Sequence, residues 1–469
     1  MNGKSESSSR NLSFYRNIYT QNRLDFLALA RDDPEFAAVC TRPGQINFRD
    51  PAAVRQLTQS LLRRDFGLKV DLPPDRLCPP VPNRVSYVLW VTELVGTTRG
   101  GSTPEQVVGL DIGTGASCIY PLLACTISPS WRFLATDIDA DSLQSARNNV
   151  ERNGLAERIR VVRRTLDDSL VALEENESLN LTFTMCNPPF YASADEMAAS
   201  AAAKQQPPHS ACTGAPVEMV YSPLAGCDVG GEIAFVGRVL AESLVLRSRV
   251  GWYTVMLGKL ASLTTLVAQL RAHGIDNYAV TALLYHGGKT RRWALGWSFG
   301  AARPTLAVAR GGPDAAGLES YKHLLPAVTE TDVYRIANTA SSGEKSVGSV
   351  VNTILSSLEL QSWNWDGNSL QGVGQTCENV WSRAWRRKKQ MEARSEVSLC
   401  PEKKPLEDSE LFGFEVTVRI GVSETVVHCL WLKGHNEAIY QSLCGFLKTK
   451  LREKLPQREE KTTAAVEVC

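Results

Sequence analysis

Apolar residues in the first hundred positions recur at the spacing of amphipathic helices. Leu24, Leu27 and Ala28 lie three and four positions apart, which predicts one helical face. The stretch 51–67, PAAVRQLTQSLLRRDFG, begins with a proline and ends with a glycine, as helices often do. After a proline-rich hinge, residues 83–95 read as another helix. We therefore expect a helical N-terminal extension over residues 1–82.

From residue 107 the pattern changes to short apolar runs that alternate with helical segments. The runs predict strands at 107–113, 132–139, 159–163, 179–186 and 252–257, with a closing pair at 277–288 and 291–299. Helices are predicted between them at 116–125, 139–154, 232–247 and 260–274. This alternation predicts an α/β fold with a Rossmann-like, doubly wound parallel sheet, whose core we place at residues 83–300.

A second unit follows a Gly- and Pro-rich linker, expected at residues 301–326. Strands at 358–365, 412–421 and 424–432, with helices at 346–357, 373–390 and 435–452, predict a small α+β domain over 327–455. Residues 391–408 are a charged insertion that we expect to be disordered, and residues 456–469 form a tail. The long connection 193–231 is predicted to be a functional loop or disordered.

Composition narrows the class of protein only a little. Of 469 residues, 43% are hydrophobic and 22% are charged, which argues against a disordered or fibrous chain. The formal net charge of +1 excludes a histone-like polycation. The 12 cysteines include no C-x-x-C pair, so we expect reduced thiols and no metal site. The polar first twelve residues and the lack of an 18-residue apolar run predict no signal peptide and no membrane span.

Two motifs at the ends of predicted strands indicate a nucleoside cofactor. LDIGTG places Asp111, Gly113 and Gly115 at a strand-to-helix turn, where glycines let the backbone approach a ligand. The D-x-G-x-G spacing fits an S-adenosylmethionine site better than a pyrophosphate site. Asp137 ends the next strand, 22 residues after Gly115, where a carboxylate accepts ribose hydroxyls. Asp139 is the competing acid, and a helix N-cap is the alternative role for Asp137.

The motif with the clearest chemistry is TMCNPPF. It places Asn187, Pro188, Pro189 and Phe190 after a predicted fourth strand, at the sheet edge where α/β enzymes bind ligands. The Asn187 side-chain carbonyl and the Pro188 backbone carbonyl would accept the two hydrogens of an exocyclic amino group, and Phe190 would stack on a flipped base. Methyl transfer then needs mainly orientation, with no catalytic triad or metal. A plain Pro-Pro turn is the alternative.

These motifs stand within a longer set of ordered blocks. NFRDPAAVRQLTQSLLRRDFGL, PVPNRVSYVLW, LDIGTGASCIYPLL, MCNPPF, GGEIAFVGRV, WYTVMLGK and RRWALGWSF occur in this order over roughly residues 12–300. This set resembles the family of RNA N6-adenosine methyltransferases that act on U6 spliceosomal RNA. It also resembles the related bacterial family that methylates an adenine in large-subunit ribosomal RNA. The resemblance implies a Rossmann-like class I methyltransferase that uses S-adenosylmethionine.

The resemblance also assigns residues by position. Arg84 matches the arginine that binds the cofactor carboxylate, and Gly113, Ser117 and Asp137 match cofactor contacts. Thr165 matches a cofactor-side position in a loop of different length. Asn187 to Phe190 match the catalytic motif.

Other family positions are matched less closely. Arg49, a candidate for RNA binding, stands where the family has a lysine beside the active site, a substitution that changes the geometry of any contact. Glu232 and Lys259 fall in family blocks, and we interpret them as structural or substrate-positioning residues.

Charge distribution, rather than net charge, indicates a nucleic-acid partner. Residues 383–404 hold eight basic and three acidic residues, and Trp381 and Trp385 stand beside or within the basic run RAWRRKK. Such a run suits phosphate contacts and base stacking. The RNA-binding candidates there are Arg383, Arg386, Arg387, Lys388 and Lys389. A solvated helix face or a nuclear import signal is the alternative. Arginines near the N-terminus (Arg10, Arg16 and Arg23) are further candidates for an RNA groove.

Taken together, the sequence predicts an RNA (adenine-N6) methyltransferase acting on a structured RNA, with U6 snRNA as the expected substrate. We expect a nuclear location, with the cytoplasm as an additional location left open, and a role in mRNA splicing. Ribosomal RNA adenine methylation remains an alternative. Protein glutamine methylation is disfavoured by Phe190 in place of tyrosine, since N-P-P-[FY] motifs also serve amide substrates. An RNA-binding splicing factor with a vestigial pocket is disfavoured by the intact glycine turn and NPPF.

Overall fold

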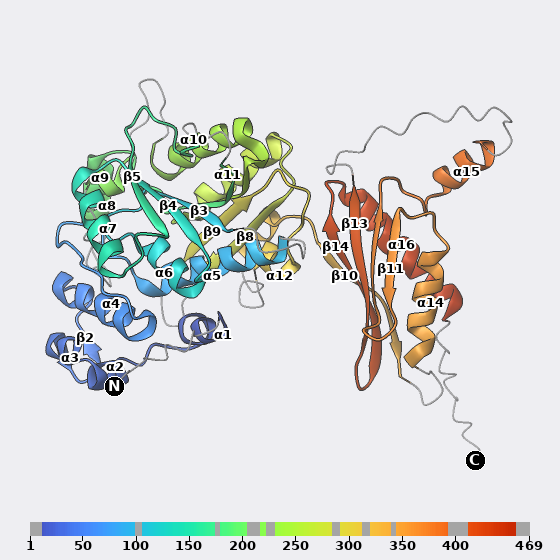
Figure 1. Cartoon of the computed structure of the whole chain (residues 1–469), viewed down its shortest axis with the longest axis horizontal. Helices are drawn as coiled ribbons and strands as arrows, with labels where there is room; N and C mark the ends of the chain where they lie inside the picture. Colours follow the sequence, from blue (N-terminus) through green and yellow to red (C-terminus); the bar gives the residue numbers. More distant parts are fainter. Residues whose placement is uncertain are drawn as a thin grey trace, which may run out of the picture. The chain divides into compact units, whose positions relative to one another are not determined.

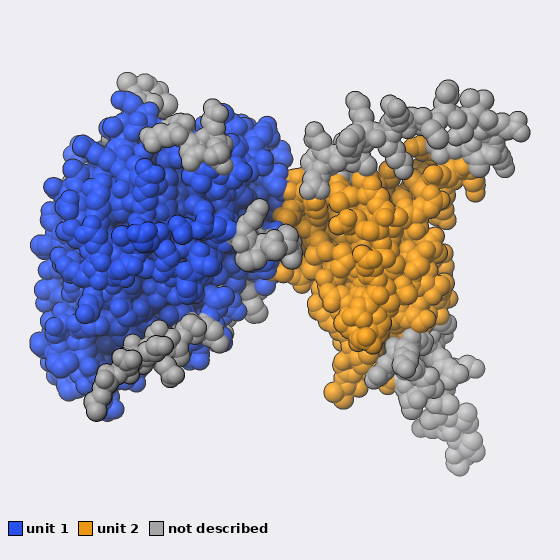
Figure 2. Space-filling model, viewed as in Figure 1, with its two compact units in different colours: residues 1–300, 307–326 blue, residues 301–306, 327–469 orange. Residues whose placement is uncertain are grey.

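The computed structural model describes residues 12–98, 106–173, 179–203, 216–221, 230–283, 291–311, 319–338, 344–392 and 411–455. The chain divides into two compact units (Figures 1 and 2). Unit 1 comprises residues 1–300 and 307–326, and unit 2 comprises residues 301–306 and 327–469. The N-terminal extension and the α/β core therefore belong to one compact unit.

The N-terminal extension is a series of short helices. Its elements are α1 (Leu12–Arg16), η1 (Asn17–Gln21), α2 (Phe26–Asp32), α3 (Pro34–Val39), β1 (Cys40–Arg42), β2 (Gln45–Ile46) and α4 (Pro51–Phe66). Asp33 lies between α2 and α3 and separates the two helices. Its side chain caps the start of α3, and Pro34 has no backbone N–H to donate to the preceding turn. The predicted helix 51–67 is confirmed as α4. Asp50 caps its start and Gly67, with φ +67°, ends it.

A seven-stranded sheet forms the centre of unit 1, with strand order β5-β4-β3-β6-β7-β9-β8. Its strands are β3 (Val108–Ile112), β4 (Arg132–Asp137), β5 (Ile159–Arg163), β6 (Leu181–Cys186), β7 (Val250–Leu257), β8 (Tyr278–Leu283) and β9 (Arg292–Trp297). The pairs from β5 to β7 are parallel, while β9 runs antiparallel to both of its neighbours. The chain order reverses between β3 and β6, so the carboxyl ends of these two strands border the crevice expected to bind ligands.

Helices cover both faces of this sheet (Figure 1). One apolar core joins α5 (Val81–Thr98), α6 (Ile119–Ile127) and α7 (Ala140–Arg152) with strand residues such as Phe133 and Phe183. A second core joins α10 (Gly231–Leu246) and α11 (Leu260–Ala272) with Leu110, Ile112 and Tyr253. Successive side chains of a strand point to opposite faces of the sheet, so they enter opposite cores. Because both faces are buried, consecutive residues of these strands are apolar. The predicted α/β fold class is confirmed.

Unit 2 is an antiparallel sheet with helices packed on one face. Its strand order is β10-β14-β13-β12-β11. The elements are β10 (Glu330–Ala337), α14 (Glu344–Ser356), β11 (Ser362–Asp366), β12 (Gln371–Thr376), α15 (Arg383–Glu392), β13 (Phe412–Ile420), β14 (Glu424–Lys433) and α16 (Glu437–Lys454). Buried residues of α14 and α16, including Val351 and Leu447, share a core with Phe414 and Trp431 of the sheet. Unit 2 is thus an α+β domain.

Two expectations about local structure need correction. The predicted helix 373–390 is wrong over its first half, because residues 371–376 form β12, where Gly372 and Gly374 accommodate neighbouring aromatic rings. The expected linker 301–326 contains α12 (Leu306–Arg310), with Val308 and Ala309 buried, and η3 (Glu319–Leu324).

The segment 193–231 contains α8 (Ala194–Ala203) and α9 (Pro216–Met219). The remainder of that segment falls largely outside the described residues, as do residues 393–408 of the expected insertion 391–408, the tail 456–469 and Arg10.

Candidate active site

The glycine turn after β3 has the geometry that its sequence predicts. Gly113 and Gly115 adopt left-handed φ values of +72° and +64°, which residues with side chains rarely adopt. The amides of Gly113 and Thr114 each donate to the Thr136 carbonyl at 2.9 Å. The turn is therefore held against the end of β4. Its backbone faces the crevice at the carboxyl ends of the strands, just before α6 begins.

The two acidic candidates after β4 have separate roles. Asp137 Oδ2 accepts from the Gly115 amide at 2.8 Å, so this carboxylate is joined to the glycine turn. Asp139 is the N-cap of α7, accepting from the Ser142 amide at 2.9 Å, and it also pairs with Arg76 at 3.1 Å. The N-cap role considered for Asp137 therefore belongs to Asp139. Burial raises the pKa of Asp137, although backbone hydrogen bonds oppose that shift.

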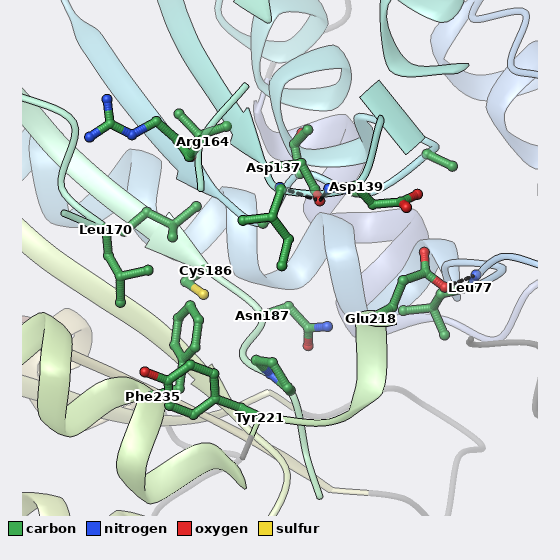
Figure 3. Close-up of a pocket in the computed structure, with 18 of the residues that line it drawn as sticks. Leu77, Asp137, Asp139, Arg164, Leu170, Cys186, Asn187, Glu218, Tyr221 and Phe235 are labelled. Atoms are coloured by element: carbon green, nitrogen blue, oxygen red, sulfur yellow. Dashed lines mark hydrogen bonds between the residues drawn. The ribbon is translucent and has the colours of Figure 1, made fainter. Parts of the chain in front are cut away.

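Asn187 follows β6 at the carboxyl edge of the sheet. Its Oδ1 atom is buried and has no hydrogen-bond partner among the described residues. A buried amide oxygen without a donor is costly in a folded protein, and such an atom often awaits a ligand. Figure 3 shows side chains from β4, from residues 216–221 and from α10 around Asn187. The amide can therefore accept a hydrogen from a group bound in this crevice.

Arg84 enters the same crevice from α5. Only 6% of the residue is exposed, and its Nη1 atom donates to the Tyr120 hydroxyl at 2.6 Å. The Nε atom is buried with no hydrogen-bond partner in the described part of the chain. A buried guanidinium with an unused donor suits a carboxylate ligand.

One cavity of about 380 Å³ brings most of the predicted cofactor residues together (Figure 3). The predicted residues that line it are Arg84, Gly113, Gly115, Ser117, Asp137, Thr165, Asn187 and Pro189. Three other predicted residues of the core, Asp111, Pro188 and Phe190, are not among its lining residues. Asp111 is fully buried within β3, and burial raises its pKa to about 7. Its place is therefore behind the glycine turn rather than on the cavity wall.

Several residues that line the cavity were not named as site candidates from the sequence. Glu218, from the segment 216–221, accepts from the Leu77 amide at 2.8 Å, so two segments 141 residues apart meet at the cavity. Tyr221, Phe235 and Arg238 also line the wall. Glu218 lies in the long connection 193–231, which has no periodic pattern of apolar residues.

The predicted RNA-binding residues are not among the residues that line this cavity. Arg49 is exposed in the turn before α4, outside the cavity lining. The basic cluster forms α15, where Lys388 pairs with Glu378 and Lys389 pairs with Glu359, each at 3.5 Å. The structure corrects the expectation that both tryptophans interleave with these cations, because Trp381 is 3% exposed and packs on Phe412 and Phe414.

The residues around the cavity fit S-adenosylmethionine. The unused Nε of Arg84 suits its carboxylate and the Asp137 carboxylate at the glycine turn suits its ribose, while the buried Asn187 Oδ1 can still accept a hydrogen bond. Among the described residues, no group of three or more His, Cys, Asp or Glu side chains is arranged to hold a metal ion. No described helix is long and apolar enough to cross a membrane.

Comparison with known proteins identifies the family. A family model described as an RNA methyltransferase matches residues 8–301. The chain belongs to this family. The U6 small nuclear RNA (adenine-(43)-N(6))-methyltransferase of Schizosaccharomyces pombe is 34% identical over 412 residues, which cover 87% of this chain and 96% of that protein. The family resemblance predicted from the ordered sequence blocks is thereby confirmed.

Animal relatives and a solved structure match the first unit. The RNA N(6)-adenosine-methyltransferase METTL16 of Homo sapiens is 42% identical over 291 residues, covering 61% of this chain. This chain spans only about half the length of that relative, at 50%. The crystal structure of the hMettl16 catalytic domain in complex with MAT2A 3′UTR hairpin 1 is 40% identical. It covers 61% of this chain and 94% of that chain, with a TM-score of 0.53.

Proposed function

We propose that this chain transfers a methyl group from S-adenosylmethionine to the N6 amino group of an adenine in a structured RNA, with U6 snRNA as the substrate. The observation that carries this proposal is the buried, unpartnered Oδ1 of Asn187 in the same cavity as the glycine turn and Asp137. The names of the yeast and animal relatives support the choice of an RNA adenine. Such a role in RNA processing supports a nuclear location.

The proposed roles follow from what each side chain offers. Arg84 binds the cofactor carboxylate, Asp137 accepts its ribose hydroxyls, and Gly113, Gly115, Ser117 and Thr165 form the wall around it. When bound, the cofactor supplies an electrophilic methyl group on a sulfonium. Asn187 Oδ1 and the Pro188 carbonyl accept the two hydrogens of the adenine amino group, which orients its nitrogen. The reaction joins that nitrogen to the methyl carbon, breaks the sulfur–carbon bond and releases one amino proton.

Two surfaces are proposed to bind the rest of the RNA. Arg16, Arg23 and Arg49 lie on the unit that contains the cavity, and α15 presents the exposed Arg383, Arg386 and Arg387. None of these three α15 arginines forms an ion pair with another described residue. Arginines without acidic partners keep their full charge for phosphate groups. We expect these contacts to determine affinity, while the cavity determines which base reacts.

The decisive experiment uses Asn187→Ala in the full chain. Removing the amide should abolish methylation of total cellular RNA, because the amino group loses its acceptor, while RNA binding measured by filter retention stays unchanged. Asn148→Ala, on the exposed side of α7, is the matched control and should keep full activity. Mapping the methylated adenines tests the substrate. Full activity in Asn187→Ala would refute the assigned chemistry, and methylation confined to RNAs other than U6 would refute the substrate.

A further inference from the structure

Phe190 is confined by backbone on one side and by a cation on the other. A Cβ atom on Gly258 would lie 2.9 and 3.0 Å from Phe190 Cε1 and Cδ1, so the ring edge rests directly on the Gly258 backbone. The guanidinium carbon of Arg292 lies 5.4 Å from the ring centroid. A Cβ on Gly231 would lie 2.9 Å from the Phe190 carbonyl oxygen. The ring that follows the NPP turn therefore has little freedom on these sides.

Glu232 holds the backbone against which this ring rests. It lies in the first turn of α10, is 2% exposed, and accepts from the Gly258 amide through Oε1 at 2.5 Å. Gly258 directly follows β7, the sheet neighbour of β6, which leads to Phe190. A Cβ on Gly258 would also lie 2.9 Å from Glu232 Oε1, so carboxylate, glycine and ring are in contact. One hydrogen bond thus joins the start of α10 to the support of Phe190.

Glu232 also carries a charge opposite in sign to that of Arg292, the cation beside the ring. Burial raises the pKa of Glu232, while the Gly258 amide, Ser262 and Lys259 lower it. Burial and the nearby Arg84 lower the pKa of Arg292, whereas Glu232 raises it. The carboxylate therefore favours a charged Arg292 beside Phe190. Glu232 does not line the cavity, so any effect on the reaction acts through these neighbours.

We infer that Glu232 is a positioning residue for methyl transfer, which sets the orientation of the Phe190 ring through the Gly258 backbone. This inference rests on the proposed function, because a fixed ring matters only if a base stacks beside Asn187. Misplacing a group by about 1 Å in such a site can lower the rate by about 100-fold. The effect should therefore appear in kcat for the methylated adenine, more than in affinity for RNA or cofactor.

The test compares Glu232→Ala, Glu232→Gln and Gly258→Ala in the full chain. Glu232→Ala removes the acceptor and should lower kcat by at least about tenfold, with the KM for RNA changed by less than about threefold. Glu232→Gln keeps an acceptor oxygen and should retain kcat within about threefold. Gly258→Ala keeps Glu232 but places a Cβ against the ring, and it should lower kcat like Glu232→Ala. Asp65→Asn, a buried carboxylate at the Tyr19 hydroxyl, controls for general destabilisation.

A Phe190→Leu background separates positioning from a structural role. Without the ring, Glu232→Ala should cause less than about a twofold further loss in kcat, since both changes act on one group. A second measurement uses a short RNA with the fluorescent base 2-aminopurine at the mapped adenine. Stacking on Phe190 quenches this fluorescence, so the quenching on binding should be weaker with Glu232→Ala than with the unaltered chain. An unchanged kcat in Glu232→Ala, or an undiminished loss in the Phe190→Leu background, overturns the inference.

If Glu232→Ala fails to fold, Gly258→Ala decides the question by the same criteria. The outcome for the proposed function is read separately. If Asn187→Ala is inactive while Glu232→Ala is fully active, only the positioning role fails. If Asn187→Ala is active, the proposed chemistry fails.

Discussion

Arg84 offers a direct test of how the cavity binds its cofactor. The side chain is 6% exposed, its Nη1 donates to the Tyr120 hydroxyl at 2.6 Å, and its Nε has no partner among the described residues. Arg84→Leu removes the only feature we assign to a cofactor carboxylate. We expect weaker S-adenosylmethionine binding, with RNA affinity unchanged.

The magnitude follows from one charge-assisted hydrogen bond. Such a bond contributes about 1.5–3 kcal/mol, which corresponds to roughly a 10- to 150-fold rise in Kd. The same variant leaves the Tyr120 hydroxyl without its charged partner, which should cost about 1–3 kcal/mol of folding stability. Arg84→Lys keeps the charge but loses the planar fork, so its Kd should fall between those of the unaltered chain and Arg84→Leu.

Isothermal titration calorimetry with S-adenosylmethionine, in the absence of RNA, measures this Kd. Thermal unfolding of each variant measures the accompanying loss of stability. The matched control is Arg64→Leu, which breaks a bidentate contact with Asp65 outside the cavity. It should lower stability and leave the Kd unchanged. An Arg84→Leu variant that folds and binds the cofactor as tightly as the unaltered chain would refute the assignment.

Two further predictions concern stability and RNA affinity. Because burial raises the folded-state pKa of Asp111 to about 7, the folded chain binds an extra proton below that pH, and stability should fall as pH rises from about 4 to 7. Asp111→Asn should remove this dependence, changing the difference in unfolding free energy between pH 5 and pH 8 by up to about 3 kcal/mol in urea titrations; parallel curves would contradict it. Replacing Arg383, Arg386 and Arg387 with alanine should reduce the slope of log affinity against log salt by about 2–3. Lys388→Ala should reduce that slope less, because Lys388 already pairs with Glu378, and equal slopes for all variants would argue against α15 as an RNA surface.

Local sequence patterns predicted the helices and strands whose buried residues recur at a regular spacing. The apolar runs of β3, β4 and β6 and the two ends of α4 are properties of short segments, so their positions follow from spacing and from Pro51 and Gly67. Strand β12 was not predicted, because two of its positions are glycines. The absence of a side chain at these glycines leaves room for the rings of Trp363 and Phe414. That space depends on neighbouring strands and has no signature in the segment itself.

The sequence by itself determined the chemistry that the cavity contains. A glycine turn, an acid 22 residues later and N-P-P-F are contiguous motifs whose backbone requirements are local. Tertiary structure alone decided that Glu218 meets Leu77 at the cavity, that Trp381 is a core residue, and that Glu232 reaches Gly258. The physical reason is that such contacts join segments brought together by the packing of the sheet and its helices. They depend on distances in space, which residue spacing along the chain does not encode.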